Sequence, residues 1–107
     1  MAKAPRFNLK EPKSSSPTLI YLYFSYNGKR LKYSTGQNIH PKYWNETKQR
    51  AKESSQFPQY PELNTFLNNL EHETLNIYRS FLNKNKIPSL NEMRKELDVH
   101  MNRKQPF

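Results

Sequence analysis

The sequence predicts an α+β fold in which a three-stranded antiparallel sheet packs on one long helix, with a partial second helix at the C-terminus. Two neighbouring runs, residues 18–26 and 29–35, are rich in β-branched and aromatic residues and are joined by Asn27-Gly28, a dipeptide typical of tight hairpins. A later run, residues 61–83, repeats apolar residues at helical spacing. The chain of 107 residues has room for one compact domain, so these elements have to share one core.

The first strand is predicted at residues 6–10, between Pro5 and Pro12. Polar and apolar side chains alternate there, which is the pattern of a strand with one buried face. Residues 11–17 (EPKSSSP) have the composition of a loop. The predicted sheet therefore spans residues 6–35.

The two-residue turn at Asn27-Gly28 fixes which hairpin residues lie opposite one another. It pairs Tyr26 with Lys29 at the tip and Ile20 with Thr35 at the far end, where Gly36 closes the return strand. One face then carries the apolar residues Phe7, Leu9, Ile20, Leu22, Phe24, Leu31 and Tyr33. The other face carries the nine candidate site residues Arg6, Asn8, Lys10, Tyr21, Tyr23, Ser25, Arg30, Lys32 and Ser34.

Between the sheet and the long helix the sequence predicts little regular structure. Residues 39–45 indicate a loop with a single helical turn begun by Pro41, and Trp44 is expected to pack in the core. Residues 46–58 are polar and basic without a period, which predicts an irregular excursion.

Two helices are predicted after this excursion. The long helix, from about residue 61 to residue 83, has an apolar side that can cover the apolar face of the sheet. A second helix begins after Ser89, which forms a capping-box pattern with Glu92. Its apolar row of Leu90, Met93 and Leu97 is thin, so we expect its packing partner to lie outside this chain.

The formal net charge of +9 is concentrated in the first half of the chain. Residues 1–53 carry eleven Lys and Arg against three acidic residues, whereas the remainder carries seven against six. The basic half also contains the predicted sheet with its tyrosines. Positive charge gathered on one part of a fold attracts polyanions, so a nucleic acid is the expected partner.

The composition argues against several other classes of protein. The absence of cysteine excludes a disulfide framework and cysteine-ligated zinc, and suits a cytosolic protein. No apolar run approaches the roughly 18 residues of a membrane span. Two glycines cannot form a phosphate-binding loop, and His40, His72 and His100 lie in different elements without metal-ligand spacing. We therefore expect no catalytic residues, metal, cofactor, small-molecule substrate or membrane.

The basic sheet face can be matched to nucleic acid in two ways. A small antiparallel sheet fits the roughly 12 Å wide major groove of duplex DNA, where Arg30 would face guanine, Asn8 would face adenine, and Lys10 and Lys32 would meet phosphates. Alternatively, tyrosines on that face would stack on the unpaired bases of RNA or single-stranded DNA. We favour duplex DNA, because RNA-reading sheets of this kind normally have four strands and only three are predicted here.

Residues 21–45 (YLYFSYNGKRLKYSTGQNIHPKYWN), with the basic stretch at residues 48–50, resemble the N-terminal arm-type DNA-binding domain of tyrosine recombinases, the phage-integrase family. The branch most similar is that of conjugative transposons and related mobile elements. The shared features are the hairpin with Asn-Gly-Lys-Arg, the Ser-Thr-Gly that follows it, and the Pro-x-x-Trp turn. The following helix and the restart at residues 87–89 agree as well, so the resemblance covers nearly the whole chain.

This resemblance implies a bacterial cytoplasmic protein, associated with the nucleoid when it is bound to DNA. The outer sheet face would enter the major groove of arm-type sites and position a recombinase whose catalytic residues lie outside this chain. It also implies that residues 1–86 form the arm-type domain, whereas residues 87–107 begin a helical core-binding domain. Other recombinase protomers are possible partners.

Two alternatives remain open at this point. The first is binding of RNA or single-stranded nucleic acid through stacking on Tyr21 and Tyr23. The second is a protein–protein interaction module of a recombination assembly, in which the two helices offer surfaces to other protomers.

Overall fold

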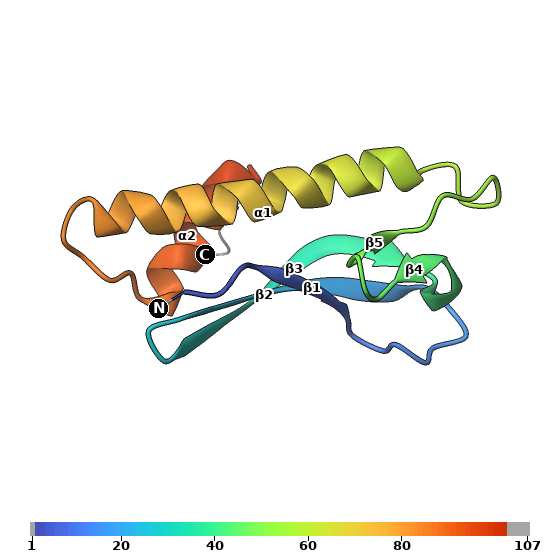
Figure 1. Ribbon diagram of the computed structural model, residues 1–107, viewed down its shortest axis with the longest axis horizontal. Coiled ribbons are helices and arrows are strands. Elements are labelled where there is room, and N and C mark those ends of the chain that lie inside the picture. The colour runs from blue at the N-terminus through green and yellow to red at the C-terminus, as the bar shows by residue number, and fades with distance from the viewer. Residues whose placement is uncertain (1, 103–107) are drawn as a thin grey trace.

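The computed structural model describes residues 2–102 and places them in two layers (Figure 1). One layer is a three-stranded antiparallel sheet in the order β1-β2-β3, and the other consists of two helices. The fold class predicted from the sequence is therefore confirmed. The principal elements are β1 (Arg6–Leu9), β2 (Thr18–Tyr26), β3 (Lys29–Ile39), α1 (Tyr60–Leu82) and α2 (Leu90–His100).

The β2–β3 hairpin has the predicted register from its tip down to Tyr21, which lies opposite Ser34. Beyond that pair, two details of the prediction are wrong. Ile20 does not pair with Thr35 across the backbone, and β3 does not end at Gly36 but continues to Ile39. The strand passes through a bulge, which Gly36 permits because its φ of +73° is a conformation that side chains disfavour.

The bulge leaves the two faces of the sheet intact. Between the pairs Tyr21–Ser34 and Leu19–Asn38, β2 advances by two residues and β3 by four. The register has thus moved by an even number of residues, and an even shift keeps every side chain on its original face. At the bulge the Thr35 hydroxyl donates a hydrogen bond to a β2 carbonyl at 2.8 Å and replaces a backbone partner.

The segment after the sheet is more regular than the sequence predicts. The helical turn at Pro41–Tyr43 (η1) and the burial of Trp44 are confirmed. The expected irregular excursion at residues 46–58, however, contains β5 (Arg50–Ala51), which pairs with β4 (Trp44–Asn45) in a short hairpin. Strands of two residues are too short to show an alternating pattern. The side-chain amide of Asn64 on α1 bonds both backbone groups of Ala51 and ties this hairpin to the helix.

The core lies between the sheet and α1, as predicted. The long helix runs across the sheet, and its buried residues are Leu63, Leu67, Leu70, Thr74, Ile77 and Tyr78 (Figure 1). They face the buried side chains Phe7, Leu9, Ile20, Leu22, Phe24, Leu31 and Tyr33 of the sheet. Phe66 and Phe81 are half-buried beside this cluster. Apolar burial of this extent is the main source of stability for so small a domain.

The helix α2 packs within this chain, so the expectation that its partner lies elsewhere is wrong. Met93 and Leu97 are fully buried in the same core, and the Tyr33 hydroxyl on β3 donates to the Asp98 carboxylate at 2.6 Å. Met93 and Leu97 alone are enough to hold α2 in place, because α1 and β3 together enclose both side chains. The predicted division at residue 87 stays a prediction, and residues 103–107 lie outside the described part of the chain.

The start of α2 confirms the predicted capping box. Ser89 accepts a hydrogen bond from the Glu92 backbone amide, and the Glu92 carboxylate accepts one from the Ser89 amide. Glu92 also pairs with Lys86. The hydrogen bond from the Lys86 ammonium lowers the pKa of the Glu92 carboxyl below its ordinary value.

An aromatic cluster joins the hairpin tip to α1 and to the segment that precedes α2. The rings of Phe24, Tyr26 and Tyr78 have centroids 5.2–5.4 Å apart. The Tyr26 hydroxyl donates to the Pro88 carbonyl at 2.8 Å, and burial raises the pKa of that phenol above its ordinary value. The position of Tyr26, which the sequence leaves open, is therefore in the core.

Replacing Met93 by Ala tests whether α2 belongs to the cooperative core. We expect Met93→Ala to reduce the free energy of unfolding by about 2–5 kcal/mol, because it leaves a cavity under α2. Val99→Ala on the same helix is the control, since Val99 is 66% exposed and its loss should change stability by less than about 0.5 kcal/mol. Urea unfolding followed by circular dichroism measures both. Equal stability of the two variants would contradict the assignment of α2 to the core.

Candidate nucleic-acid interface

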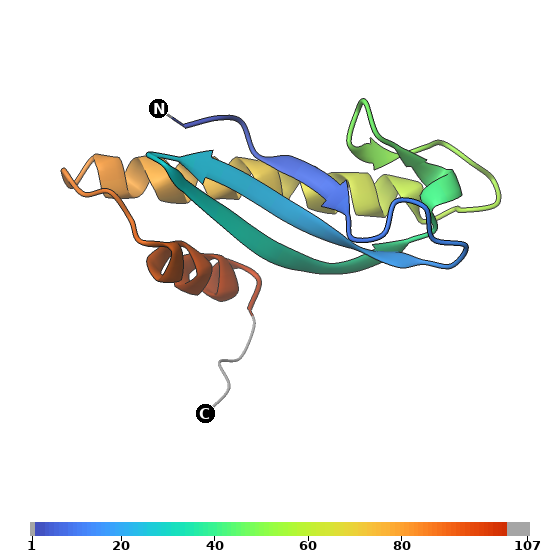
Figure 2. The same ribbon diagram turned by 90° about the horizontal axis from the view of Figure 1, so that it is seen from below.

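The outer face of the sheet is uncovered in the described part of the chain. Figure 2 shows it from below, with α1 behind the sheet and α2 beside β3. The strand pairing places Tyr23 opposite both Arg6 and Lys32, and Tyr21 opposite both Asn8 and Ser34. The predicted residues Arg6, Asn8, Tyr21, Tyr23, Ser25, Arg30, Lys32 and Ser34 therefore form one continuous surface, and Lys10 follows directly after β1.

Two cations on this face are held against tyrosine rings. The Arg30 guanidinium lies 4.4 Å from the centroid of the Tyr23 ring, and the Lys32 ammonium lies 4.4 Å from that of Tyr21. Each cation leans diagonally across the hairpin, because its direct partners are Ser25 and Tyr23 respectively. Such a contact is worth about 0.5–1 kcal/mol at an exposed site and orders a long side chain before a ligand arrives. The tyrosines thus position the cations, and each ring has one face occupied.

The basic stretch after the Pro-x-x-Trp turn has a structural role. Arg50 forms an ion pair with Glu71 on α1 at 3.0 Å, donates to Asn68 at 2.9 Å, and lies over the ring of Phe7. The Gln49 side-chain oxygen accepts a hydrogen bond from the backbone N–H of Phe7 at 2.8 Å. This backbone group of the edge strand β1 is therefore already hydrogen-bonded. Gln49 and Arg50, which belong to the basic stretch at residues 48–50, therefore hold the hairpin of β4 and β5 against the sheet and α1.

The bulge extends this face by a pair of residues that the sequence alone does not indicate. Leu19 lies opposite Asn38, so the outer face continues by one more pair, and Asn38 is exposed on it. The predicted strand ends at Thr35, before Asn38, because Gly36 suggests the end of a strand. The apolar residue Ile39 lies beyond this glycine and is buried in the core. Its presence would have indicated the longer strand.

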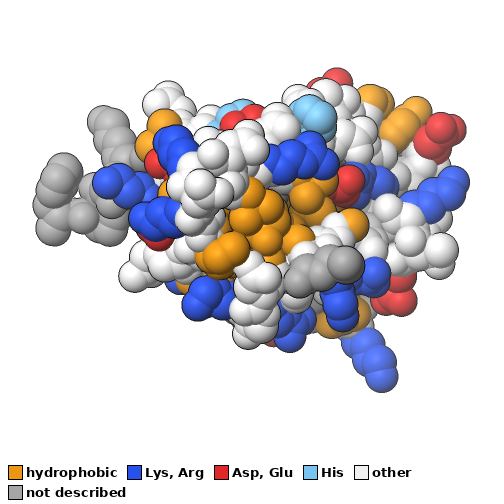
Figure 3. All heavy atoms as spheres, turned by 60° about the vertical axis from the view of Figure 1, so that its left-hand side comes forward, with side chains coloured by type: hydrophobic (Ala, Val, Ile, Leu, Met, Phe, Trp, Pro, Cys, Tyr) orange, Lys and Arg blue, Asp and Glu red, His pale blue; other side chains and the backbone are white. Residues whose placement is uncertain are grey.

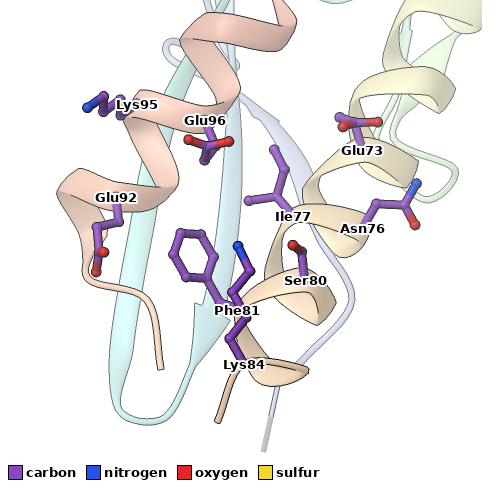
Figure 4. Close-up of a pocket in the computed structure, with 9 residues that line it drawn as sticks. All are labelled: Glu73, Asn76, Ile77, Ser80, Phe81, Lys84, Glu92, Lys95 and Glu96. Atoms are coloured by element: carbon purple, nitrogen blue, oxygen red, sulfur yellow. The ribbon is translucent and has the colours of Figure 1, made fainter. Parts of the chain in front are cut away.

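The acidic residues lie mainly on the opposite side of the molecule. Six of the nine acidic residues belong to the helices, namely Glu62, Glu71, Glu73, Glu92, Glu96 and Asp98. Between α1 and α2 is a groove of about 470 Å³ with Ile77 and Phe81 at its base (Figure 4). Its rim mixes carboxylates from both helices with the ammonium groups of Lys84 and Lys95. The fold therefore separates a cationic sheet face from a helix layer of mixed charge.

Residues 2–102, which the structure describes, lack two further kinds of feature. They contain no group of three or more His, Cys, Asp or Glu side chains placed to hold a metal ion. None of their helices combines the length and the apolar character needed to cross a membrane.

A small sheet with a basic, uncovered face, held on a helix layer, is an architecture found among DNA-binding modules. Residues 8–94 match the family described as Arm DNA-binding domain, and the chain belongs to this family. The resemblance to the arm-type domain of tyrosine recombinases is thereby confirmed. DNA is the partner that this family implies, and an arm DNA-binding domain is not itself catalytic. Comparisons with curated proteins and with solved structures found no match.

The contact of Lys32 with Tyr21 can be tested without DNA. We expect the Lys32 side-chain methylene protons next to the ammonium to be shifted upfield in the NMR spectrum, because they lie in the shielding region of the ring. Tyr21→Phe should keep this shift and Tyr21→Leu should abolish it. Lys10, for which no ring contact occurs among the described residues, is the internal control. Unshifted Lys32 protons in the unsubstituted chain would contradict the geometry.

Proposed function

We propose that the chain binds duplex DNA by placing the outer face of its sheet in the major groove, and that it positions a tyrosine recombinase on arm-type sites during DNA integration and recombination. The observation that carries this proposal is the uncovered face on which Arg30 and Lys32 are held over Tyr23 and Tyr21. The family of the chain supports DNA as the ligand. The bacterial cytoplasm is the compartment that such a role requires.

The dimensions of the sheet support insertion into the major groove. Neighbouring strands lie about 4.8 Å apart, so the backbones of three strands span about 10 Å, close to the roughly 12 Å width of that groove. Because side chains alternate along each strand, the outer row alone would meet the base edges. Arg30 would contact guanine and Asn8 adenine, whereas Lys10 and Lys32 would contact phosphates.

The tyrosine contacts favour duplex DNA over an unpaired strand. A base that stacks on Tyr21 or Tyr23 would have to displace the cation or use the remaining face of the ring. The rings are also tilted by 46° to one another, with centroids 6.3 Å apart, so they do not form a flat platform. Single-strand binding through Tyr21 and Tyr23 is accordingly the weaker candidate.

Arginine and lysine on the face should affect binding differently. On a duplex selected for tight binding, Arg30→Ala should weaken affinity and reduce discrimination at one base pair by about 1–3 kcal/mol, because a bidentate contact is lost. Lys32→Ala should weaken binding about equally on all sequences. Lys95→Ala, which removes the same charge from the α1–α2 groove, is the control. Competition binding with mutated duplexes measures the three variants. Unchanged base preference in Arg30→Ala would contradict the assigned role.

Substitution of the tyrosines separates duplex from single-strand binding. Tyr23→Phe retains the ring under Arg30 and should retain duplex affinity, whereas Tyr23→Leu should reduce it, because Arg30 is no longer ordered. Parallel titrations with a duplex and with one of its strands provide the comparison. A larger loss on the single strand than on the duplex would favour the stacking function instead.

A further inference from the structure

The tip of the β2–β3 hairpin carries a small basic hollow beside the outer face. Lys3, Lys29 and Arg30 line a space of about 320 Å³, together with polar and backbone groups of the turn, and no acidic side chain lines it. Figure 3 brings this end of the molecule forward and shows several Lys and Arg side chains along its lower side. Lys3 and Lys29 are both exposed and were not among the residues predicted to bind DNA.

The fold holds these cations in place from both sides of the hairpin. The backbone N–H of Lys3 donates to the Ser25 carbonyl at 3.0 Å, so the segment before β1 continues along β2 as far as the tip. Lys29 begins β3 directly opposite Tyr26, whose side chain is anchored in the core. The positive φ values of Asn27 and Gly28 make the turn tight. The hollow is therefore built on a fixed backbone.

The positive charge at the tip lacks a carboxylate partner among the described residues. The ion pairs they form involve Arg50, Lys86 and His100, all outside the tip. Cations gathered without acidic neighbours repel one another, and an anion that enters between them relieves this repulsion. A phosphodiester has the charge and the acceptor oxygens that such a site would take.

The length of the hairpin indicates where that phosphodiester would come from. The nine residues of β2 extend about 30 Å, whereas the major groove winds once around the duplex in about 34 Å. A hairpin of this length does not follow the groove through a full turn, so it leaves the groove at its ends and meets the sugar–phosphate backbone there. The hairpin tip is one such end, immediately beyond Arg30.

We propose that the hairpin tip is a phosphate-binding site in which Lys3 and Lys29 hold one backbone segment of the duplex read by the neighbouring sheet face. This inference rests on the proposed function, since it requires a duplex on the outer face. It adds a contact that fixes the position of the sheet in the groove without reading sequence.

The salt dependence of binding tests this site with the full chain. The probe is a mixed-sequence DNA duplex of about two helical turns, which suffices because a phosphate contact is independent of sequence. Each phosphate contact contributes about 0.9 to the slope of log affinity against log salt concentration. We expect Lys3→Ala and Lys29→Ala each to reduce the slope, their double variant to reduce it by at least about 0.9, and Lys29→Arg to preserve it. Fluorescence anisotropy at several salt concentrations gives the slopes, and thermal melts check that the variants are folded.

The control and the outcomes separate this site from the proposed function. Lys84→Ala removes the same charge from the α1–α2 groove and should leave the slope unchanged. A steep slope for the unsubstituted chain, with tip variants that behave like Lys84→Ala, would overturn the phosphate site and leave binding by the sheet face standing. A flat slope for the unsubstituted chain would overturn both.

Discussion

The pairing of β2 with β3 in a single register is the constraint on which the rest of this structure depends. The tight turn at Asn27-Gly28 sets that register, and alternation then sends one row of side chains into the core and the other to the outer face. The buried row gives α1 and α2 their packing surface, whereas the outer row gathers the cations and tyrosines. A shift by one residue would exchange the two rows, so folding and the proposed DNA-binding surface depend on the same pairing.

The helix layer and the sheet have different roles in the structure. The helices cover the apolar face and carry most of the acidic residues. The hairpin is anchored through Tyr33 to Asp98 on α2 and through Tyr26 to the Pro88 carbonyl between the helices. The sheet is thereby left with an uncovered basic surface whose backbone is fixed. Because Tyr21 and Tyr23 hold their cations before any ligand is bound, less side-chain entropy has to be lost on binding.

Much of this arrangement could be predicted from the sequence, since alternation and an Asn-Gly turn determine the faces of a hairpin. The parts that could not be predicted depend on contacts between distant residues. From the local sequence, Gly36 is expected to end the strand, whereas the bulge there lets β3 continue. That Asn38 lies on the outer face follows only from its pairing with β2. The few apolar residues of α2 suffice for packing only because β3 and α1 leave space in which Met93 and Leu97 are fully buried. The proposed phosphate site joins Lys3, which precedes β1, to Lys29 at the start of β3.

We propose above all that the outer face of the sheet is the surface that contacts DNA. The most direct test of this proposal is a titration of the isotope-labelled chain with a DNA duplex, followed through the backbone amide signals in NMR spectra. Binding through the outer face predicts the largest shifts at residues of β1, β2 and β3 whose side chains point outward, and at the hairpin tip. Shifts confined to α1 and α2, with the sheet signals unchanged, would contradict it and would favour the helices as the binding surface.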